Sequence, residues 1–301
     1  MRDHGSIKYT VIIPHRDIIR LLERCLDSIP RRDDIQVIVV DDNSRLDEAV
    51  WLDFRSRYAH VELYLTREGR GAGYARNVAL PKARGEWVLF ADTDDFFYEG
   101  AFAHFDEWAG SGHDILYFQC DSRYSDTLAP AEDRLLYIRP YIDSRDPEQL
   151  RYRWVVPWGK MIRRSLIVNA GLRFEEVETA NDVMFSIRLG YAAGSLRLTC
   201  SEPLYCSTVR SDSLYFKKTI RGTICRVKVA RRANGFLHKR GLDEYRISIK
   251  HIDRFFPWHP ILFVWGLWMF REDGNTIGYV KTLCEGARAY LTNSVRRLVH
   301  K

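Results

Sequence analysis

The chain has 301 residues and a formal net charge of +6, which is long enough for one large domain with a sizeable core and an extension. Its basic excess is concentrated in residues 215–241, which contain nine Lys or Arg and no Asp or Glu, whereas the rest of the chain contains 37 basic and 40 acidic side chains. This distribution argues against a generally basic nucleic-acid-binding protein.

Three continuous apolar segments, residues 9–14, 35–40 and 87–90, predict strands. Each is apolar on both faces, which is typical of a parallel sheet covered by helices. Residues 18–29 repeat apolar side chains at helical spacing, and residues 74–83 predict a second helix. The charged residues of the first helix are expected on its outer face: Arg20, Glu23, Arg24 and Asp27. This alternation predicts an α/β fold of the doubly wound type, in which ligands bind beyond the carboxyl ends of the strands.

Two acidic clusters lie where such a fold binds its ligands. Asp41 and Asp42 end the second strand, and Asp92, Asp94 and Asp95 follow the third. Asp92 and Asp94 are separated by one residue, so in an extended conformation they point to the same side. Paired carboxylates suit Mg²⁺ or Mn²⁺, with water and phosphates completing the shell. One such cluster alone could be a solvated acidic turn after a strand. Because both clusters follow strands at the same edge of the predicted sheet, we favour a single binding site.

A glycine-rich stretch, residues 71–77, lies between the two clusters. Its glycines would let the backbone approach a nucleotide, and Arg76 can hold a carboxylate or a phosphate. For Arg76 and Asn77, contact with a bound nucleotide and anchoring of the loop are equally weighted alternatives. At Asp42, a carboxylate can accept the imide N–H of uracil or a ribose hydroxyl, and an Asx turn after the strand is compatible with that role.

The second half of the chain contains another helix pattern with an acidic start. Residues 181–189 predict a helix with Asp182 near its first turn, where an acidic side chain caps free N–H groups. Upstream, Trp158 can form a stacking wall for a ring or be ordinary core, and Lys160 can orient a nearby carboxylate. Capping of the helix is the simplest alternative for Asp182.

These segments together resemble a known family. The motifs in chain order are VIIPHRD, LLERCLDSI, VIVVDDNS, GAGYARNVALPKARGEWVLFADTDD, PWGKMIRRSLI and NDVMFSIRLG. In order and spacing they are similar to family 2 inverting glycosyltransferases with the GT-A fold, of the kind that builds bacterial polysaccharide or lipopolysaccharide. The resemblance covers residues 8–215. It implies a mixed α/β sheet flanked by helices; after it, the residue pattern of the last third predicts a mainly helical C-terminal extension.

The resemblance also implies roles for individual residues. Asp42 would contact the base, Asp92 and Asp94 would hold Mn²⁺ or Mg²⁺, and Asp182 would be the general base towards the acceptor hydroxyl. The implied donor-binding positions are Pro14, Asp42, Arg76, Asp92, Thr93, Asp94 and Arg210.

The chain departs from the family pattern at two places. Asn181 stands where the family usually has a glutamate, which removes a charge beside Asp182 and predicts a lower pKa for that carboxyl. Glu178 is the reserve candidate for the base. In the family's phosphate-binding loop, Cys206 and Thr208 replace the common tyrosine and arginine, while Arg210 and Ser213 remain as candidate diphosphate ligands.

The C-terminal third combines a basic and an aromatic segment. Residues 217–240 predict a helix with an apolar stripe and a basic flank. Residues 255–270 are uncharged and contain Trp258, Trp265 and Trp268, but they are short for a membrane span and include two prolines. This pairing fits a segment lying in a membrane interface. An apolar cap on the catalytic domain or on a second subunit is the alternative.

Two further features of the sequence bear on the cellular compartment of the protein. No apolar segment of the signal-peptide type follows residues 1–6, and the six cysteines form no CxxC pair. Both features favour a cytoplasmic protein with reduced thiols, which we expect at the inner face of the cell membrane.

The complete hypothesis is a metal-dependent inverting glycosyltransferase. Residues 1–210 would form the GT-A domain, with a donor half over 1–100 and an acceptor half over 101–210, and residues 211–301 the extension. The donor would be a nucleoside diphosphate sugar, with UDP-sugar favoured, and the acceptor a glycan or lipid-linked glycan; homo-oligomerisation remains open. A sugar-phosphate nucleotidyltransferase would need a glycine- and basic-rich loop after the first strand, where this chain has residues 14–17. A non-catalytic membrane scaffold would have no use for aligned carboxylates.

Overall fold

The computed structural model describes residues 6–131, 139–144, 146–210, 219–248 and 259–270. The chain divides into two compact units, residues 1–217 and residues 218–301. Each unit is described by itself below.

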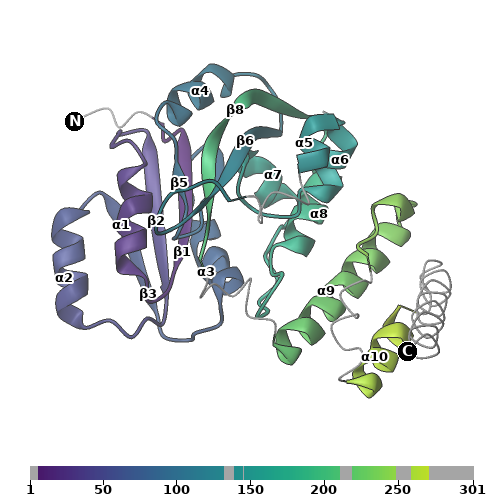
Figure 1. Cartoon of the computed structure of the whole chain (residues 1–301). Helices are drawn as coiled ribbons and strands as arrows, with labels where there is room; N and C mark the ends of the chain where they lie inside the picture. The colour runs from purple at the N-terminus through teal and green to yellow at the C-terminus, as the bar shows by residue number, and fades with distance from the viewer. Residues whose placement is uncertain (1–5, 132–138, 145, 211–218, 249–258, 271–301) are drawn as a thin grey trace, which may run out of the picture. The chain divides into compact units, whose positions relative to one another are not determined.

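The first unit is built on one eight-stranded sheet. Its strands, in chain order, are β1 (Tyr9–His15), β2 (Ile35–Asp42), β3 (Val61–Thr66), β4 (Trp87–Phe90), β5 (Phe96–Phe97), β6 (Ile115–Tyr124), β7 (Lys160–Arg163) and β8 (Leu196–Val209). Their spatial order is β3-β2-β1-β4-β7-β6-β8-β5. β1, β2, β3 and β4 pair in parallel, whereas β7 pairs antiparallel with both β4 and β6. Figure 1 shows β6 and β8, which are parallel, as long curved ribbons lying side by side. The predicted mixed α/β sheet is confirmed.

Helices flank this sheet (Figure 1). They are α1 (Ile19–Asp27), α2 (Glu48–Arg57), α3 (Ala72–Ala79), α4 (Ala101–Trp108), α5 (Arg139–Ser144), α6 (Pro147–Arg153), α7 (Arg164–Asn169) and α8 (Val183–Ala192). The helix predicted over 74–83 begins earlier, because Gly71 adopts φ 92° and forms its N-cap. It ends earlier as well, and the chain continues as a short 3₁₀ turn, η1 (Leu80–Lys82), which contains Pro81.

The core explains why three strands read as continuous apolar runs. All seven residues of β1 and all four residues of β4 are buried, since helices cover both faces of the sheet centre. Near the carboxyl end of β4, the ring of Phe174 stacks on Phe185 at 4.0 Å and meets Phe90 edge-on at 5.1 Å. This aromatic cluster packs the start of α8 against the sheet, and so positions the second half of the site.

The second unit contains α9 (Ile220–His238), the 3₁₀ turn η2 (Asp243–Tyr245) and α10 (Pro260–Met269). Val227 and Ala230 of α9 form a small core with Phe270, which follows α10. The amide of Asn234 exchanges two hydrogen bonds with the backbone of Ile247, at 2.7 and 3.1 Å. Among the helices that the structure describes, none combines the length and apolar character needed to cross a bilayer. Of the predicted aromatic run, residues 255–258 lie outside the described residues.

Candidate active site

The carboxyl ends of β1, β2 and β4 meet at one edge of the sheet, because these strands are parallel neighbours. His15 pairs in register with Asp41, and the chain beyond β4 leads directly into Asp92. Thr93 donates its hydroxyl to the carbonyl oxygen of Pro14, which ties the turn after β4 to the end of β1. Pro14, Thr93 and both acidic clusters therefore lie at the predicted edge.

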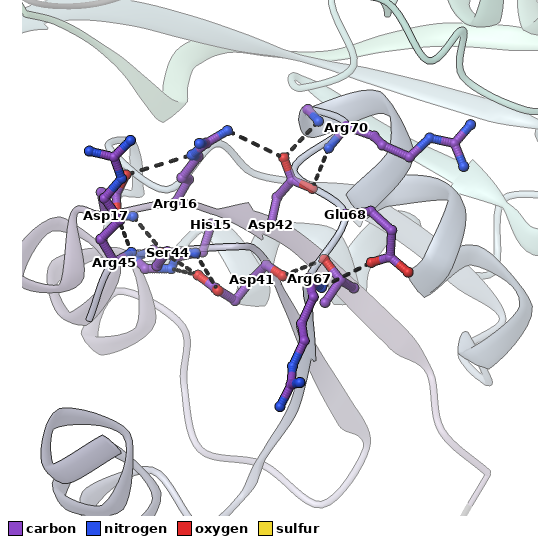
Figure 2. A network of polar contacts seen from close by, with 12 residues as sticks. His15, Arg16, Asp17, Asp41, Asp42, Ser44, Arg45, Arg67, Glu68 and Arg70 are labelled. Carbon is purple, nitrogen blue, oxygen red and sulfur yellow. Dashed lines mark hydrogen bonds and ion pairs between the residues drawn. The ribbon is translucent and has the colours of Figure 1, made fainter. Parts of the chain in front are cut away.

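Asp41 is a buried structural carboxylate. Its Oδ1 lies 2.8 Å from Nδ1 of His15, and its Oδ2 accepts the backbone N–H of Ser44 at 2.9 Å. Burial by itself raises the pKa of Asp41, but the hydrogen bonds from His15 and Ser44 outweigh it and hold the pKa below its ordinary value. Figure 2 shows this carboxylate facing His15 and Ser44. Asp41 therefore ties the end of β1, through His15, to the turn after β2, through Ser44.

Asp42 faces the opposite way and holds the glycine-rich loop. Its two carboxylate oxygens accept the backbone N–H groups of Arg70 at 3.0 Å and Gly71 at 2.6 Å, and Nη1 of Arg16 lies 3.9 Å away (Figure 2). The residue is only 2 % exposed. A carboxylate has about four lone-pair sites, so these two backbone hydrogen bonds leave capacity for a ligand donor.

Close packing fixes the path of the same loop. A Cβ atom at Gly73 would lie 2.2 Å from the carbonyl oxygen of Glu175, so the backbone of α3 touches the segment that leads to α8. On the same helix, Asn77 donates to the carbonyl of Phe174 at 3.0 Å and accepts its backbone N–H at 2.9 Å. Of the two alternatives for Asn77, the structure shows anchoring.

The three carboxylates after β4 have different environments. Asp95 is fully buried and accepts the Tyr205 hydroxyl at 2.7 Å and the Thr208 N–H at 2.6 Å. The Asp92 and Asp94 side chains are partly exposed, at 26 % and 16 %. Asp95 therefore fastens β8 to the turn, while the other two remain accessible to a ligand.

The turn itself is held by contacts to the backbone carbonyl of Asp94. This oxygen accepts Nη2 of Arg24 at 2.5 Å and the hydroxyl of Thr208 at 2.6 Å. The expectation that Arg24 points outward is wrong, since its guanidinium also donates to Ser125. The hydroxyl of Thr208 therefore helps to hold the turn.

Two arginines approach the accessible carboxylates. Arg76 is buried and donates Nη2 to Asp92 at 2.5 Å and Nη1 to the side-chain oxygen of Asn181 at 2.9 Å. Arg210 lies near Asp94, with Nη1 3.7 Å from Oδ2. Ser213 lies outside the described residues. The structure thus brings Arg76, Arg210, Asp92 and Asp94 together.

Asp182 stands at the N-cap position of α8, but its side chain makes no capping hydrogen bond. The simple capping role is therefore absent. Burial raises the pKa of Asp182 and the charge of Asp92 raises it further, while Arg76 and Lys160 lower it. The charge missing at position 181 predicted a lower pKa for Asp182, and this prediction is wrong because burial dominates. Asp182 directly follows Asn181, whose side chain accepts a hydrogen bond from Arg76, so it lies near Arg76 and Asp92.

Lys160 and Trp158 support the site from within the core. The ammonium of Lys160 donates to the carbonyls of Trp154 at 2.7 Å and Val156 at 2.8 Å, and burial lowers its pKa to about 7. Trp158 is buried and stacks on Tyr205 at 5.8 Å. Trp158 is therefore core, and Lys160 holds backbone carbonyls near Asp182 rather than a carboxylate directly.

A small divalent cation fits the donor set at the turn. Across the residues that the structure describes, no group of three or more His, Cys, Asp or Glu is arranged to hold a metal by itself. Asp92 and Asp94 nevertheless offer two hard oxygen donors, and Mg²⁺ or Mn²⁺ commonly binds through one or two carboxylates with water and substrate phosphates completing the shell. The site therefore suits a cation that arrives with a phosphorylated ligand.

Comparison with known proteins identifies the class. Residues 10–169 match the family model named glycosyl transferase family 2. This match covers more than half of the chain, and the chain belongs to that family. The predicted family is confirmed.

Three similar proteins illustrate the relationship. The chain is 27 % identical to the uncharacterized glycosyltransferase EpsJ of Bacillus subtilis over 68 % of this chain, and it spans 62 % of EpsJ, less than two thirds. The structure of TarS residues 1–349 from Staphylococcus aureus, solved with UDP-GlcNAc, matches with a TM-score of 0.60 and 22 % identity, covering 84 % of this chain and 74 % of that one. A mannosyltransferase from Pyrobaculum calidifontis, solved with GDP-Man and Mn²⁺, matches with a TM-score of 0.52 and 19 % identity over 96 % and 83 % of the chains. The predicted GT-A fold is thereby confirmed.

Proposed function

We propose that this glycosyltransferase moves a sugar from a nucleoside diphosphate donor, with UDP-sugar favoured, to a hydroxyl of a glycan or lipid-linked glycan. The observation that carries the proposal is that Arg76 links Asp92, in the turn that also holds Asp94, to Asn181, the neighbour of Asp182, although the two segments are about ninety residues apart. Two accessible carboxylates for a cation and a third for an acceptor proton are the groups that this transfer needs.

The nucleotide would bind at the ends of β1 and β2. Asp42 would accept the imide N–H of uracil, while Pro14 and Thr93 shape the floor beneath the nucleotide. The TarS structure contains UDP-GlcNAc, which supports a uridine nucleotide for a chain with the same fold.

The diphosphate would lie over the turn after β4. Asp92 and Asp94 would hold Mn²⁺ or Mg²⁺, which neutralises the charge of a leaving diphosphate when bound. Arg210, beside Asp94, would add a second positive charge to the same group. The P. calidifontis enzyme was solved with GDP-Man and Mn²⁺, which supports a metal in this fold.

Asp182 would take the proton of the acceptor hydroxyl. Its carboxylate is not used in capping α8, and its pKa, raised by burial, brings it closer to the range in which a general base is effective. A hydroxyl activated by a base on the acceptor side attacks the anomeric carbon opposite the leaving diphosphate. One displacement of this kind inverts the configuration.

A nucleotide panel tests the donor assignment. Purified full-length protein is mixed with UDP, GDP, CDP and ADP, each with and without Mn²⁺, and its thermal unfolding is followed. We expect UDP with Mn²⁺ to raise the Tm most, because a ligand that binds only the folded state stabilises it. Slow hydrolysis of one UDP-sugar should accompany this shift. A larger shift with GDP would transfer the assignment to a guanosine donor, and no shift with any nucleotide would contradict it.

The second unit, together with residues 211–217, would form an extension that binds anionic lipid. On α10, Ile261, Val264 and Trp268 are exposed and spaced three and four residues apart, so they share one face. The guanidinium of Arg231 on α9 lies 6.0 Å from the Trp268 ring. An apolar face bordered by basic residues suits an anionic membrane surface, where cytosolic nucleotide sugars meet lipid-linked acceptors.

Flotation with anionic liposomes tests the membrane proposal. We expect the protein to float at low salt and less so at high salt, since each Lys or Arg near the surface contributes about 1 kcal/mol. Trp268→Ser should weaken flotation more than Trp265→Ser, because Trp265 packs in the small core of the second unit. Leu52→Ser, on an exposed position of α2, is the control and should float as the wild type does. Protein that stays at the bottom of the gradient at low salt would favour a domain cap or dimer interface.

A further inference from the structure

Arg76 connects the two halves of the site through one buried side chain. It is 4 % exposed, its guanidinium lies 5.1 Å from the ring of Phe174, and its two terminal nitrogens reach Asp92 and Asn181. Its third nitrogen, Nε, is buried and has no hydrogen-bond partner among the described residues. The hydrogen bonds of this cation are thus directed to one carboxylate and one neutral amide.

The consequence for Asp92 is electrostatic as well as geometric. A guanidinium stays protonated in proteins, so the charge of Arg76 is permanent. It occupies Oδ1 of Asp92 and cancels much of the negative charge that would attract a cation. The contact uses Oδ1, and the Asp92 side chain stays 26 % exposed to a ligand. Asp94 has Arg210 nearby, so both carboxylates at the turn are partly neutralised.

The side chain of Asn181 holds one end of the Arg76 guanidinium. Its backbone carbonyl accepts the N–H of Glu175 at 3.1 Å, and its Cβ lies 3.0 Å from the Cβ position of Gly73, so the residue is held in place. Its amide oxygen orients the guanidinium without sharing a negative charge with it. An acidic residue here would draw Arg76 away from Asp92.

We propose that Asn181 and Arg76 are positioning residues that keep the cation affinity of the free enzyme low and make cation binding depend on a nucleoside diphosphate. With Asp92 and Asp94 partly neutralised, a divalent cation alone gains little, whereas a cation carrying a diphosphate brings its own ligands. This inference rests on the proposed function, because it assumes the cation site at Asp92 and Asp94.

A double-mutant cycle tests the proposal by direct Mn²⁺ binding. Full-length wild type, Asn181→Asp, Arg76→Met and the double variant are titrated with Mn²⁺, with and without saturating UDP, and unbound Mn²⁺ is measured by its EPR signal. Without UDP, we expect Asn181→Asp to bind Mn²⁺ about tenfold more tightly, a usual effect of one nearby charge. In the Arg76→Met background the same change should tighten Mn²⁺ binding less than it does in the wild-type background, because only the direct attraction of the new carboxylate remains and no guanidinium is left to redistribute.

Asn169→Asp is the matched control. It makes the same chemical change at an exposed residue that ends α7. The helix follows β7, and β7 pairs with β4 through Arg163 and Trp87, at the end of β4 opposite to Asp92. Its Mn²⁺ affinity should equal that of the wild type. Equal tightening by Asn181→Asp in both backgrounds, or none in the wild-type background, would overturn the inference. UDP binding by calorimetry is measured in parallel: loss of Mn²⁺ binding in all variants with UDP present would reject the metal site itself, while retained UDP binding would leave the donor assignment standing.

Discussion

Asp94→Asn should reduce sugar transfer about a thousandfold or more while leaving the protein folded. The carboxylate would be lost as a cation ligand, which removes several kcal/mol of charge stabilisation from the transition state. The fold should survive because the Arg24 and Thr208 contacts reach the backbone carbonyl of Asp94, which asparagine retains. Transfer with a UDP-sugar and Mn²⁺, together with thermal unfolding, measures both effects.

Asp95→Asn is the matched control for this prediction. Its carboxylate is fully buried and accepts Tyr205 and Thr208, so the change should destabilise the folded protein by about 1–3 kcal/mol. Replacing Asp94 would then lower the rate of transfer, whereas replacing the neighbouring Asp95 would lower the stability of the folded protein. Wild-type activity of Asp94→Asn in chelator-treated buffer would contradict the metal assignment.

Asp182→Asn should lower turnover by about two to four orders of magnitude, the usual contribution of a general base. UDP binding should persist, since Asp182 faces the acceptor in the proposed reaction. Steady-state kinetics and calorimetry with UDP measure the two quantities. A variant that loses UDP binding instead would remove Asp182 from the role of base.

The pH dependence of the wild type tests the same assignment. Burial and the charge of Asp92 raise the pKa of Asp182, and the base works only when deprotonated. Activity should therefore fall as the pH decreases through this raised pKa, at a higher pH than an ordinary aspartate would give. Asp146→Ala provides a contrast, because Asp146 caps α6 through the N–H of Glu148 at 3.0 Å. That variant should lose stability of about 1 kcal/mol and keep the same acid limb.

Much of the fold was predictable because its signals are local. Residues 9–14, 35–40 and 87–90 are continuous apolar runs, and such runs are required where a strand is buried on both faces. Since the carboxyl ends of parallel strands meet at one edge, the two acidic clusters could be assigned to that edge before any contact was known. The start of α8 at Val183, one residue after Asp182, was also readable from its pattern.

Contacts between distant segments could not be read in this way. Arg24 lies 70 residues from Asp94 and 101 residues from Ser125, and its helical position alone favoured solvent. Spacing paired Asp92 with Asp94 but gave Asp95 no role, and only the structure shows that Tyr205, 110 residues away, makes Asp95 structural.

By itself, the sequence of this protein determined three of the eight strands, the sheet edge at which the two acidic clusters lie and the family to which the chain belongs. Local periodicity and the chemistry of the residue types were sufficient for these. Only the tertiary structure decided which carboxylates are already used, that Asp182 does not cap its helix, and that Arg76 donates to both Asp92 and Asn181. The physical reason is that the burial and partners of a charged group depend on segments brought together by folding, and these set its charge state and availability.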